Sequence, residues 1–318
     1  MNFTSINALK FKEMDENVVL NKKNLVGFMM SQIVRKKDLG HYRTSEAYAS
    51  ALKSFMRFRN NEDLRLSDMN SDLMQLYESY LINTCHLTKN SSSFYMRILR
   101  AVYNNAVERR LTKHRQPFKY VYTGVEKTVK RALPLRVIKK IKNLDLSYAR
   151  SVDFARDMFM FSFYTRGMSF IDMAYLKKSD LRNGVLTYRR RKTKQLLSIK
   201  WEKCMQEIVD KYPINDGQYL LPIILHRCRK ERLQYRSVMS SVNMYLKPLG
   251  ESLKLPFSLT MYVARHSWAS VARSKKVPVS IISEAMGHDS ETTTQIYLAS
   301  IETTVVDRVN RKIIKSLL

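Results

Sequence analysis

The sequence has few cysteines, few glycines and no long apolar run, and each shortage excludes a class of protein. Its three cysteines, Cys85, Cys204 and Cys228, are odd in number and far apart, which argues against a disulfide framework or a zinc site and fits a reducing cytoplasm. Eight glycines in 318 residues leave little room for a Gly-rich phosphate loop, which disfavours a nucleotide-driven machine. No apolar run approaches the roughly 20 residues that cross a bilayer, and no secretory signal pattern opens the chain.

Acidic residues are also scarce relative to basic ones. The chain has 56 Lys and Arg residues against 28 Asp and Glu residues, which gives a formal net charge of +28. Such an excess predicts a polyanionic partner, most often nucleic acid and less often an acidic membrane surface. Because basic residues run along the whole chain, we exclude a neutral enzyme with a basic tail. The length and the 45% hydrophobic content are typical of two folded domains.

The first domain is expected over residues 21–115, after an N-terminal extension (residues 1–20) that has no clear pattern. Apolar side chains recur there at three- and four-residue steps, which predicts four amphipathic helices and hence a small bundle. Four arginines of the last helix lie off its apolar stripe, where they either form a solvated face or contact DNA phosphates. We favour phosphate contacts for these four, Arg97, Arg100, Arg109 and Arg110.

The second domain is expected over residues 134–318. Residues 116–133 are basic and lead to a proline, which is typical of an extended linker between domains. Helical patterns then resume. A strong turn at residues 183–184 is followed by Val185–Arg189 and Leu196–Lys200, which predict two antiparallel strands joined by a basic turn. The expected fold class is mainly α, with a small antiparallel β-sheet on the second domain.

The residues with the clearest chemistry lie between Leu259 and Tyr297. Arg265 stands in a helical segment, His288 follows a glycine, and Tyr297 comes nine residues after His288. Taken singly, these residues have ordinary explanations: a surface arginine, a turn residue after glycine and a half-buried helix residue. Their combination is far rarer than any one of them.

This combination resembles box II of the tyrosine recombinase, or phage integrase, family. The family pattern has His-x-x-Arg on a helix, then Leu-Gly-His, then a tyrosine nine residues beyond that histidine. The resemblance extends over residues 25–318. It implies that the helical bundle is a SAM-like core-binding domain and that residues 134–318 form the catalytic domain, with the β-hairpin in its expected place.

The resemblance implies a role for each matching residue. Tyr297 would attack a DNA phosphate, forming a 3′-phosphotyrosine and freeing a 5′-hydroxyl. Arg265 and His288 would bind the phosphoryl oxygens, with His266 as a supporting neighbour and with no metal or cofactor. In the hairpin turn, Lys192 would protonate the departing 5′ oxygen, and Lys194 is the alternative.

Two positions depart from the family pattern. Tyr262 replaces the histidine of His-x-x-Arg; a phenol is a poor base at neutral pH, so its expected role is to hydrogen-bond a phosphate oxygen or to support the site. Ser169 stands where the family has its first catalytic arginine. We expect Arg166 to supply the missing guanidinium, with Arg190 as the other candidate. Ser169 also fits a helix N-cap, and the resemblance implies that Asp172 positions an active-site arginine.

The last segment of the chain has an apolar stripe at four-residue steps, which predicts a helix. It packs either on its own domain or, as is common in the family, on a neighbouring protomer. The stripe comprises Val305, Val309, Ile313 and Leu317.

The expected function is site-specific DNA recombination in the cytoplasm, at the nucleoid. The expected partners are duplex DNA with specific recombination sites and further copies of the chain, in a tetramer on two sites; accessory DNA-bending proteins are compatible with this function. The rival functions are a type IB topoisomerase and a catalytically inactive architectural DNA-binding protein. The residues do not identify the target sequence, nor do they distinguish integration, excision, inversion and dimer resolution.

Overall fold

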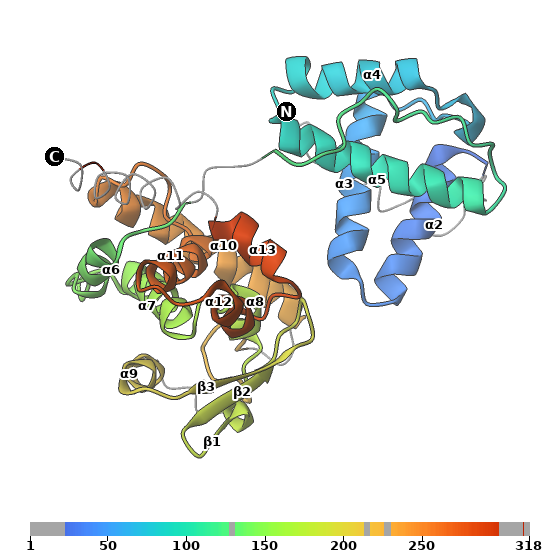
Figure 1. Cartoon of the computed structure of the whole chain (residues 1–318). Helices are drawn as coiled ribbons and strands as arrows, with labels where there is room; N and C mark the ends of the chain where they lie inside the picture. The colour runs from blue at the N-terminus through green and yellow to red at the C-terminus, as the bar shows by residue number, and fades with distance from the viewer. Residues whose placement is uncertain (1–22, 127–130, 213–216, 226–229, 299–313, 315–318) are drawn as a thin grey trace. The chain divides into compact units, whose positions relative to one another are not determined.

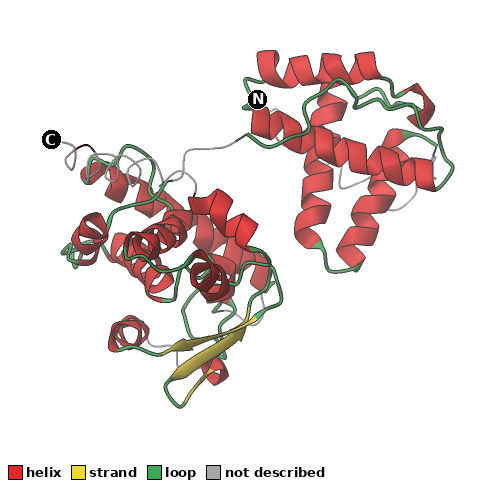
Figure 2. Cartoon of the chain, viewed as in Figure 1, coloured by secondary structure: helices red, strands yellow, loops and turns green. Residues whose placement is uncertain are grey.

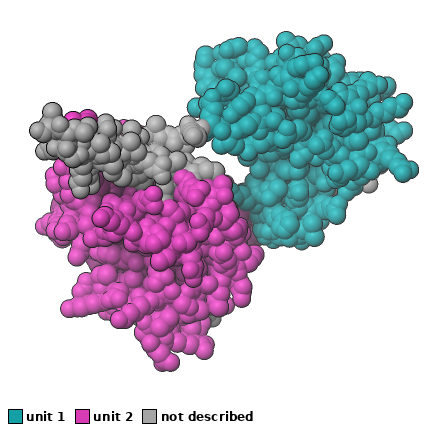
Figure 3. All heavy atoms as spheres, in the orientation of Figure 1, with its two compact units in different colours: residues 1–128 teal, residues 129–318 magenta. Residues whose placement is uncertain are grey.

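The computed structural model describes residues 23–126, 131–212, 217–225, 230–298 and 314. The chain forms two compact units, Met1–Thr128 and Val129–Leu318 (Figure 3). Within the described ranges, no helix is long and apolar enough to cross a membrane.

The first unit is helical, as predicted. Among its described residues, four α-helices begin close to the positions that the apolar periodicity indicated, and a π-turn, Tyr80–Thr84, extends the third of them. A short 3₁₀ turn, Leu66–Asp68, precedes that helix. The helices are α2 (Leu25–Asp38), α3 (Tyr42–Phe58), α4 (Ser71–Ser79) and α5 (Lys89–Glu108) (Figure 1).

The core of this unit extends beyond α5 into the segment that was expected to be a linker. Phe118 and Val121 are buried in the same cluster as the stripe residues of α3 and α5. The hydroxyl of Tyr103 donates to the carbonyl of Lys113 at 2.7 Å, and the hydroxyl of Ser93 donates to the carbonyl of Gly124 at 2.5 Å. The start of the expected linker, residues 116–133, is therefore packed on the first unit, because its apolar side chains complete that core.

The second unit is a helical body with a small sheet, which confirms the expected fold class (Figure 2). A 3₁₀ turn, Lys178–Asp180, leads into the sheet. The helices are α6 (Leu135–Lys142), α7 (Arg150–Tyr164), α8 (Phe170–Ala174), α9 (Lys203–Lys211), α10 (Glu231–Ser252), α11 (Met261–Ser274), α12 (Val279–Met286) and α13 (Glu291–Leu298).

The sheet has the antiparallel order β1–β2–β3, with β1 at Leu181–Arg182, β2 at Val185–Arg189 and β3 at Leu196–Lys200. Leu186 pairs with Ile199, and both side chains are buried. The two predicted strands have the observed bounds. The two-residue β1 was not predicted, because two residues are too few to show a period.

The core of the second unit fixes the elements that carry the candidate site. Helix α7 packs against both α10 and α11, and its Phe159 and Phe161 are fully buried. The segment that leads into α6 is attached to α11, because the backbone N–H of Leu133 donates to the hydroxyl of Ser267 at 2.9 Å. The end of α7 and the middle of α11 are therefore held side by side.

Candidate active site

The candidate site lies where four segments of the second unit meet. They are the turn after α7, the helix α11, the turn between β2 and β3, and the loop between α12 and α13. Arg265 links three of these segments. Its side chain is only 6% exposed, and it donates to the carbonyls of Gly167 at 2.6 Å and Met286 at 2.7 Å. Its Nη2 also lies 3.0 Å from Nε2 of His288.

Gly167 is required for this approach of the α7 turn to α11. Its φ of +73° is in the left-handed region, and a Cβ there would lie 2.8 Å from Cα of Arg265. A side chain at this position would therefore displace the arginine backbone as well as strain its own.

We expect Gly167→Ala to lower the free energy of unfolding by about 2–5 kcal/mol, because left-handed strain adds to an overpacked contact. Gly184→Ala is the matched control: its φ is +71°, but a Cβ there meets nothing within 4 Å, so only the strain of about 1–2 kcal/mol applies. Chemical denaturation of both variants measures the difference. Equal losses in the two variants would show that the contact with Arg265 does not matter.

His288 is placed by the end of α12. Gly287 closes that helix in the left-handed conformation, with φ +63°, and the next residue turns its ring toward Arg265. Nδ1 of His288 lies 2.7 Å from Oγ1 of Thr294 in α13. Burial, followed by the positive charges of Arg265, Arg190 and Lys192, lowers the pKa of His288 to about 4. The imidazole is therefore neutral at neutral pH.

The β2–β3 turn is attached to the same loop. Arg190 and Thr193 both donate to the carbonyl of Gly287, the second at 3.2 Å, and the side-chain amide of Gln195 donates to the carbonyl of His288 at 3.3 Å. Lys192 is exposed in this turn and is among the charges that lower the pKa of His288. The structure thus brings Lys192 to the same site as His288.

Lys194, the alternative lysine, is also exposed in this turn and has a φ of +63°. Its backbone helps to close the turn, because its N–H donates to the carbonyl of Arg190 at 2.8 Å. Its carbonyl accepts from the guanidinium of Arg189 at 2.6 Å.

Asp172 holds the backbone of this turn, not an arginine side chain. It is 3% exposed, and its Oδ1 accepts from the backbone N–H of Arg191 at 2.8 Å. Its Oδ2 accepts from the hydroxyl of Ser169 at 2.6 Å. The expectation that Asp172 positions a guanidinium differs from this geometry, because the donors to its carboxylate among the described residues are a backbone N–H and a hydroxyl. Ser169 lies at the N-cap of α8 but makes no side-chain cap hydrogen bond.

Arg166 and Arg190 both lie near the candidate site, but they differ in burial and in hydrogen bonding. Arg166 is half-buried, has a φ of +60° and makes no hydrogen bond or ion pair with any described residue. Arg190 is 6% exposed, and its Nε is buried without a partner among the described residues. Both charges act on the buried phenol of Tyr188, whose pKa is raised mainly by burial. The two candidates for the missing guanidinium are therefore both at the site.

Tyr262 and His266 form a pair on α11. Their rings meet edge to face, with centroids 4.4 Å apart. Tyr262 is 61% exposed, while His266 is 5% exposed. The structure thus places Tyr262 at the surface of the helix that carries Arg265, and buries His266 beneath it.

The nucleophile candidate, Tyr297, lies in α13, three residues after Thr294, and its side chain is outside the described residues. The apolar stripe Val305, Val309, Ile313 and Leu317 also falls outside them.

The four arginines singled out in the first unit are all exposed. Arg100 donates to the hydroxyl of Thr123 at 2.8 Å, and Arg97 donates to the carbonyl of Ser93 at 3.4 Å. Arg109 lies over the ring of Phe28. Arg110 has a φ of +57° at the end of α5. Their exposure leaves them accessible to a partner.

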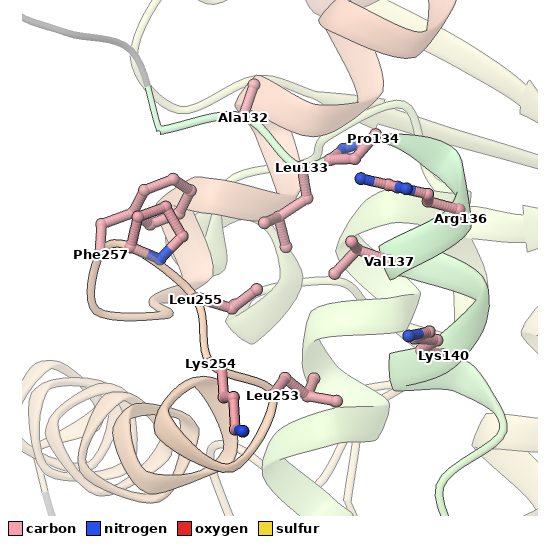
Figure 4. A pocket seen from close by; sticks show the side chains of 11 residues that line it. Ala132, Leu133, Pro134, Arg136, Val137, Lys140, Leu253, Lys254, Leu255 and Phe257 are labelled. Atoms are coloured by element: carbon pink, nitrogen blue, oxygen red, sulfur yellow. The ribbon is translucent and has the colours of Figure 1, made fainter.

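An apolar pocket of about 420 Å³ lies elsewhere in the second unit (Figure 4). Leu133, Val137, Leu255 and Phe257 line it, and none of its lining residues belongs to the candidate site.

Sequence reasoning did not identify Thr193, Gln195 or Thr294 as parts of the site. Thr294 belongs to a run of three threonines that looks like an ordinary polar helix face. The available signal was its position one helical turn before Tyr297, which places the two residues on one side of a helix.

Comparisons with known proteins identify both domains and the fold. Residues 24–122 match the phage integrase SAM-like domain, and residues 153–303 match the phage integrase family. No curated protein matches the sequence. A lambda integrase dimer bound to a COC′ core site is similar in fold, with a TM-score of 0.64 and 18% identity over 86% of this chain and 95% of that chain.

Two other solved structures share the fold. The Tn1549 transposon integrase in complex with a circular intermediate DNA has a TM-score of 0.63 and 14% identity over 88% of this chain and 98% of its own. The XerH site-specific recombinase bound to a palindromic difH substrate has a TM-score of 0.62 and 14% identity over 84% of this chain and 79% of its own. With both domain models matched in order and the same two-unit fold, the chain belongs to the phage integrase, or tyrosine recombinase, family.

Proposed function

We propose that this chain is a site-specific DNA recombinase that cuts and rejoins duplex DNA through a 3′-phosphotyrosine at Tyr297. The observation that carries the proposal is the contact between the buried Arg265 and the half-buried His288, to which α13 is joined through Thr294. A buried guanidinium beside a neutral imidazole, with Lys192 in the adjoining turn, is a site for a phosphate group.

The chemistry follows from these groups. The phenol oxygen of Tyr297 forms a bond to the scissile phosphorus, and the bond from phosphorus to the 5′ oxygen breaks. Lys192 gives a proton to the departing 5′ oxygen. Arg265 donates two N–H groups to the non-bridging oxygens, in place of its present carbonyl partners, and so stabilises the charge that develops there.

The proton of the phenol needs an acceptor. Tyr262 is a poor base, because phenols ionise near pH 10. The neutral imidazole of His288 has a lone pair on Nε2, which becomes available when Arg265 turns to the phosphate. His288 then takes the proton and, as an imidazolium, donates to the phosphoryl group. The phosphotyrosine keeps the energy of the broken bond, so rejoining needs no ATP.

We propose that Arg166 supplies the guanidinium that the family usually has at the position of Ser169. Its side chain makes no hydrogen bond or ion pair with the described part of the chain, so a phosphate can engage it without breaking an existing contact. Arg190 is the alternative, and its unpartnered buried Nε supports it.

We expect Arg166→Ala to slow DNA cleavage about 10²- to 10³-fold, because a donor to the transition state is lost, while Ser169→Ala changes it little. Single-turnover cleavage of a nicked substrate measures both. Arg190→Lys is the companion variant, because lysine keeps a positive donor for the carbonyl of Gly287. Full cleavage by Arg166→Ala with a large loss in Arg190→Lys assigns the role to Arg190.

The proposed partners are duplex DNA and further copies of the chain. The net charge of +28 and the exposed arginines of the first unit favour a DNA partner. A lambda integrase has been solved as a tetramer bound to a Holliday junction. By analogy of fold, we propose a tetramer on two recombination sites, with strand exchange in two steps.

Covalent trapping tests the proposed function. The protein is incubated with a library of nicked duplexes that carry random sequence, and complexes that resist detergent are isolated and their DNA sequenced. A covalent adduct on one recurring sequence supports a site-specific recombinase. Relaxation of supercoiled plasmid at any sequence supports a topoisomerase instead, and DNA binding without any adduct supports an architectural protein.

A further inference from the structure

Thr294 attaches α13 to the candidate site. Its side chain is 0% exposed, and its Oγ1 lies 2.7 Å from Nδ1 of His288. Helix α13 also packs against α11 and α12. Tyr297 follows Thr294 by three residues, one turn further along α13. One hydrogen bond therefore joins the helix of the nucleophile to an imidazole of the phosphate site.

The direction of this hydrogen bond follows from the other side of the ring. A guanidinium has only N–H donors, and Nη2 of Arg265 lies 3.0 Å from Nε2 of His288. Nε2 must therefore accept with its lone pair. The single proton of the neutral imidazole is then on Nδ1, and Nδ1–H donates to the hydroxyl oxygen of Thr294.

We propose that Thr294 is a positioning residue that keeps the proton of His288 on Nδ1 and the lone pair of Nε2 turned toward Arg265. The same hydrogen bond sets α13, and with it Tyr297, against the site. This inference rests on the proposed function, because the groups it aligns are the proposed phosphate ligands and nucleophile.

The arrangement confines proton exchange to one nitrogen. Nδ1 carries a hydrogen in both the neutral ring and the imidazolium, so Thr294 accepts from it in both states. When Nε2 takes up a proton during the reaction, the ring does not have to turn. Without the hydroxyl, Nδ1–H loses the acceptor that Thr294 provides. Part of the population then adopts the other tautomer, in which an N–H on Nε2 points at the N–H of Arg265.

Three variants of α13 test the proposal. Thr294→Val keeps the shape of the side chain but removes the acceptor, and Thr294→Ser keeps the hydroxyl. Thr292→Val makes the same chemical change at an exposed position of the same helix. Thermal unfolding of each variant shows whether the unit is folded.

Two measurements are made on each variant: the rate of covalent adduct formation on a nicked duplex, and the tautomer of His288 by ¹⁵N NMR. The chain has six histidines, and His288→Gln assigns the signal. We expect Thr294→Val to slow adduct formation about 10- to 100-fold, by analogy with the loss of a partner that orients a metal-binding histidine. We expect the His288 signal to move from one Nδ1–H tautomer toward a mixture.

Thr294→Ser should restore both properties, and Thr292→Val should change neither. A wild-type rate in Thr294→Val, or a slower rate with the tautomer unchanged, overturns the proposal. The NMR measurement of the tautomer does not require the protein to cleave DNA. If the wild-type protein forms no adduct, the proposed function fails, while the tautomer of His288 still decides whether Thr294 positions the ring.

Discussion

We expect Tyr297→Phe to abolish the covalent protein–DNA adduct and to leave the affinity for duplex DNA within about twofold of wild type. The phenyl ring has no oxygen with which to attack phosphorus, and no other group in the proposed mechanism forms that bond. Because the lost hydroxyl is one neutral group among many cationic contacts, we expect binding to be retained. Denaturing electrophoresis of the protein on its nicked substrate measures the adduct, and filter binding measures the affinity.

Tyr148→Phe is the matched control for this variant. Tyr148 lies in the same unit, is 83% exposed and has no place in the proposed mechanism, so it should form the adduct at the wild-type rate. If Tyr297→Phe still forms an adduct, the nucleophile is a different residue. Mass spectrometry of the nuclease-digested adduct then identifies the peptide that carries the nucleotide.

Arg265→Lys should reduce the rate of cleavage about 10³-fold or more. Lysine keeps the positive charge but has one ammonium in place of a planar fork, so it cannot hold two phosphoryl oxygens at once. The loss of an arginine that stabilises phosphoryl transfer has an effect of about 10³–10⁵-fold in other enzymes. Single-turnover cleavage at saturating protein measures the chemical step apart from binding.

The same substitution also affects folding. The carbonyls of Gly167 and Met286 lose a donor, and a buried group left unpaired costs about 1–3 kcal/mol. Chemical denaturation therefore accompanies the kinetic measurement. Arg273→Lys, in the last turn of the same helix, is the control and should cleave normally. Cleavage by folded Arg265→Lys within tenfold of wild type contradicts the proposed role of the guanidinium.

Much of the fold could be predicted from local patterns. The stripes of the first unit mark helices because residues three and four apart share a helix face, and Leu52, Phe55 and Leu99 are indeed buried. The strands of the hairpin follow from alternation and from the Asn183–Gly184 turn, which has positive φ at both residues. The start of the expected linker packs on the first unit because Phe118 and Val121 join its core, and this tertiary contact leaves no local pattern in the sequence.

The candidate site was predictable in its residue types but not in its contacts. Arg265, His288 and Tyr297 stand out because their spacing is unusual in any sequence. The contact of Asp172 with the turn at Arg191, 19 residues away, is one that no local pattern reveals. The same holds for Gln195, whose amide reaches a carbonyl in the loop after α12.

By itself, the sequence determined the charge of the chain, its helices and hairpin, and the order of the residues suited to phosphate chemistry, because these depend on composition and on neighbours along the chain. Only the tertiary structure decided which atoms meet. The carbonyl of Gly167 reaches Arg265 because a glycine lets a turn approach a helix, and His288 is neutral because burial and nearby cations disfavour its charged form. Such contacts join residues about a hundred positions apart, and their energies depend on distance and burial rather than on sequence spacing.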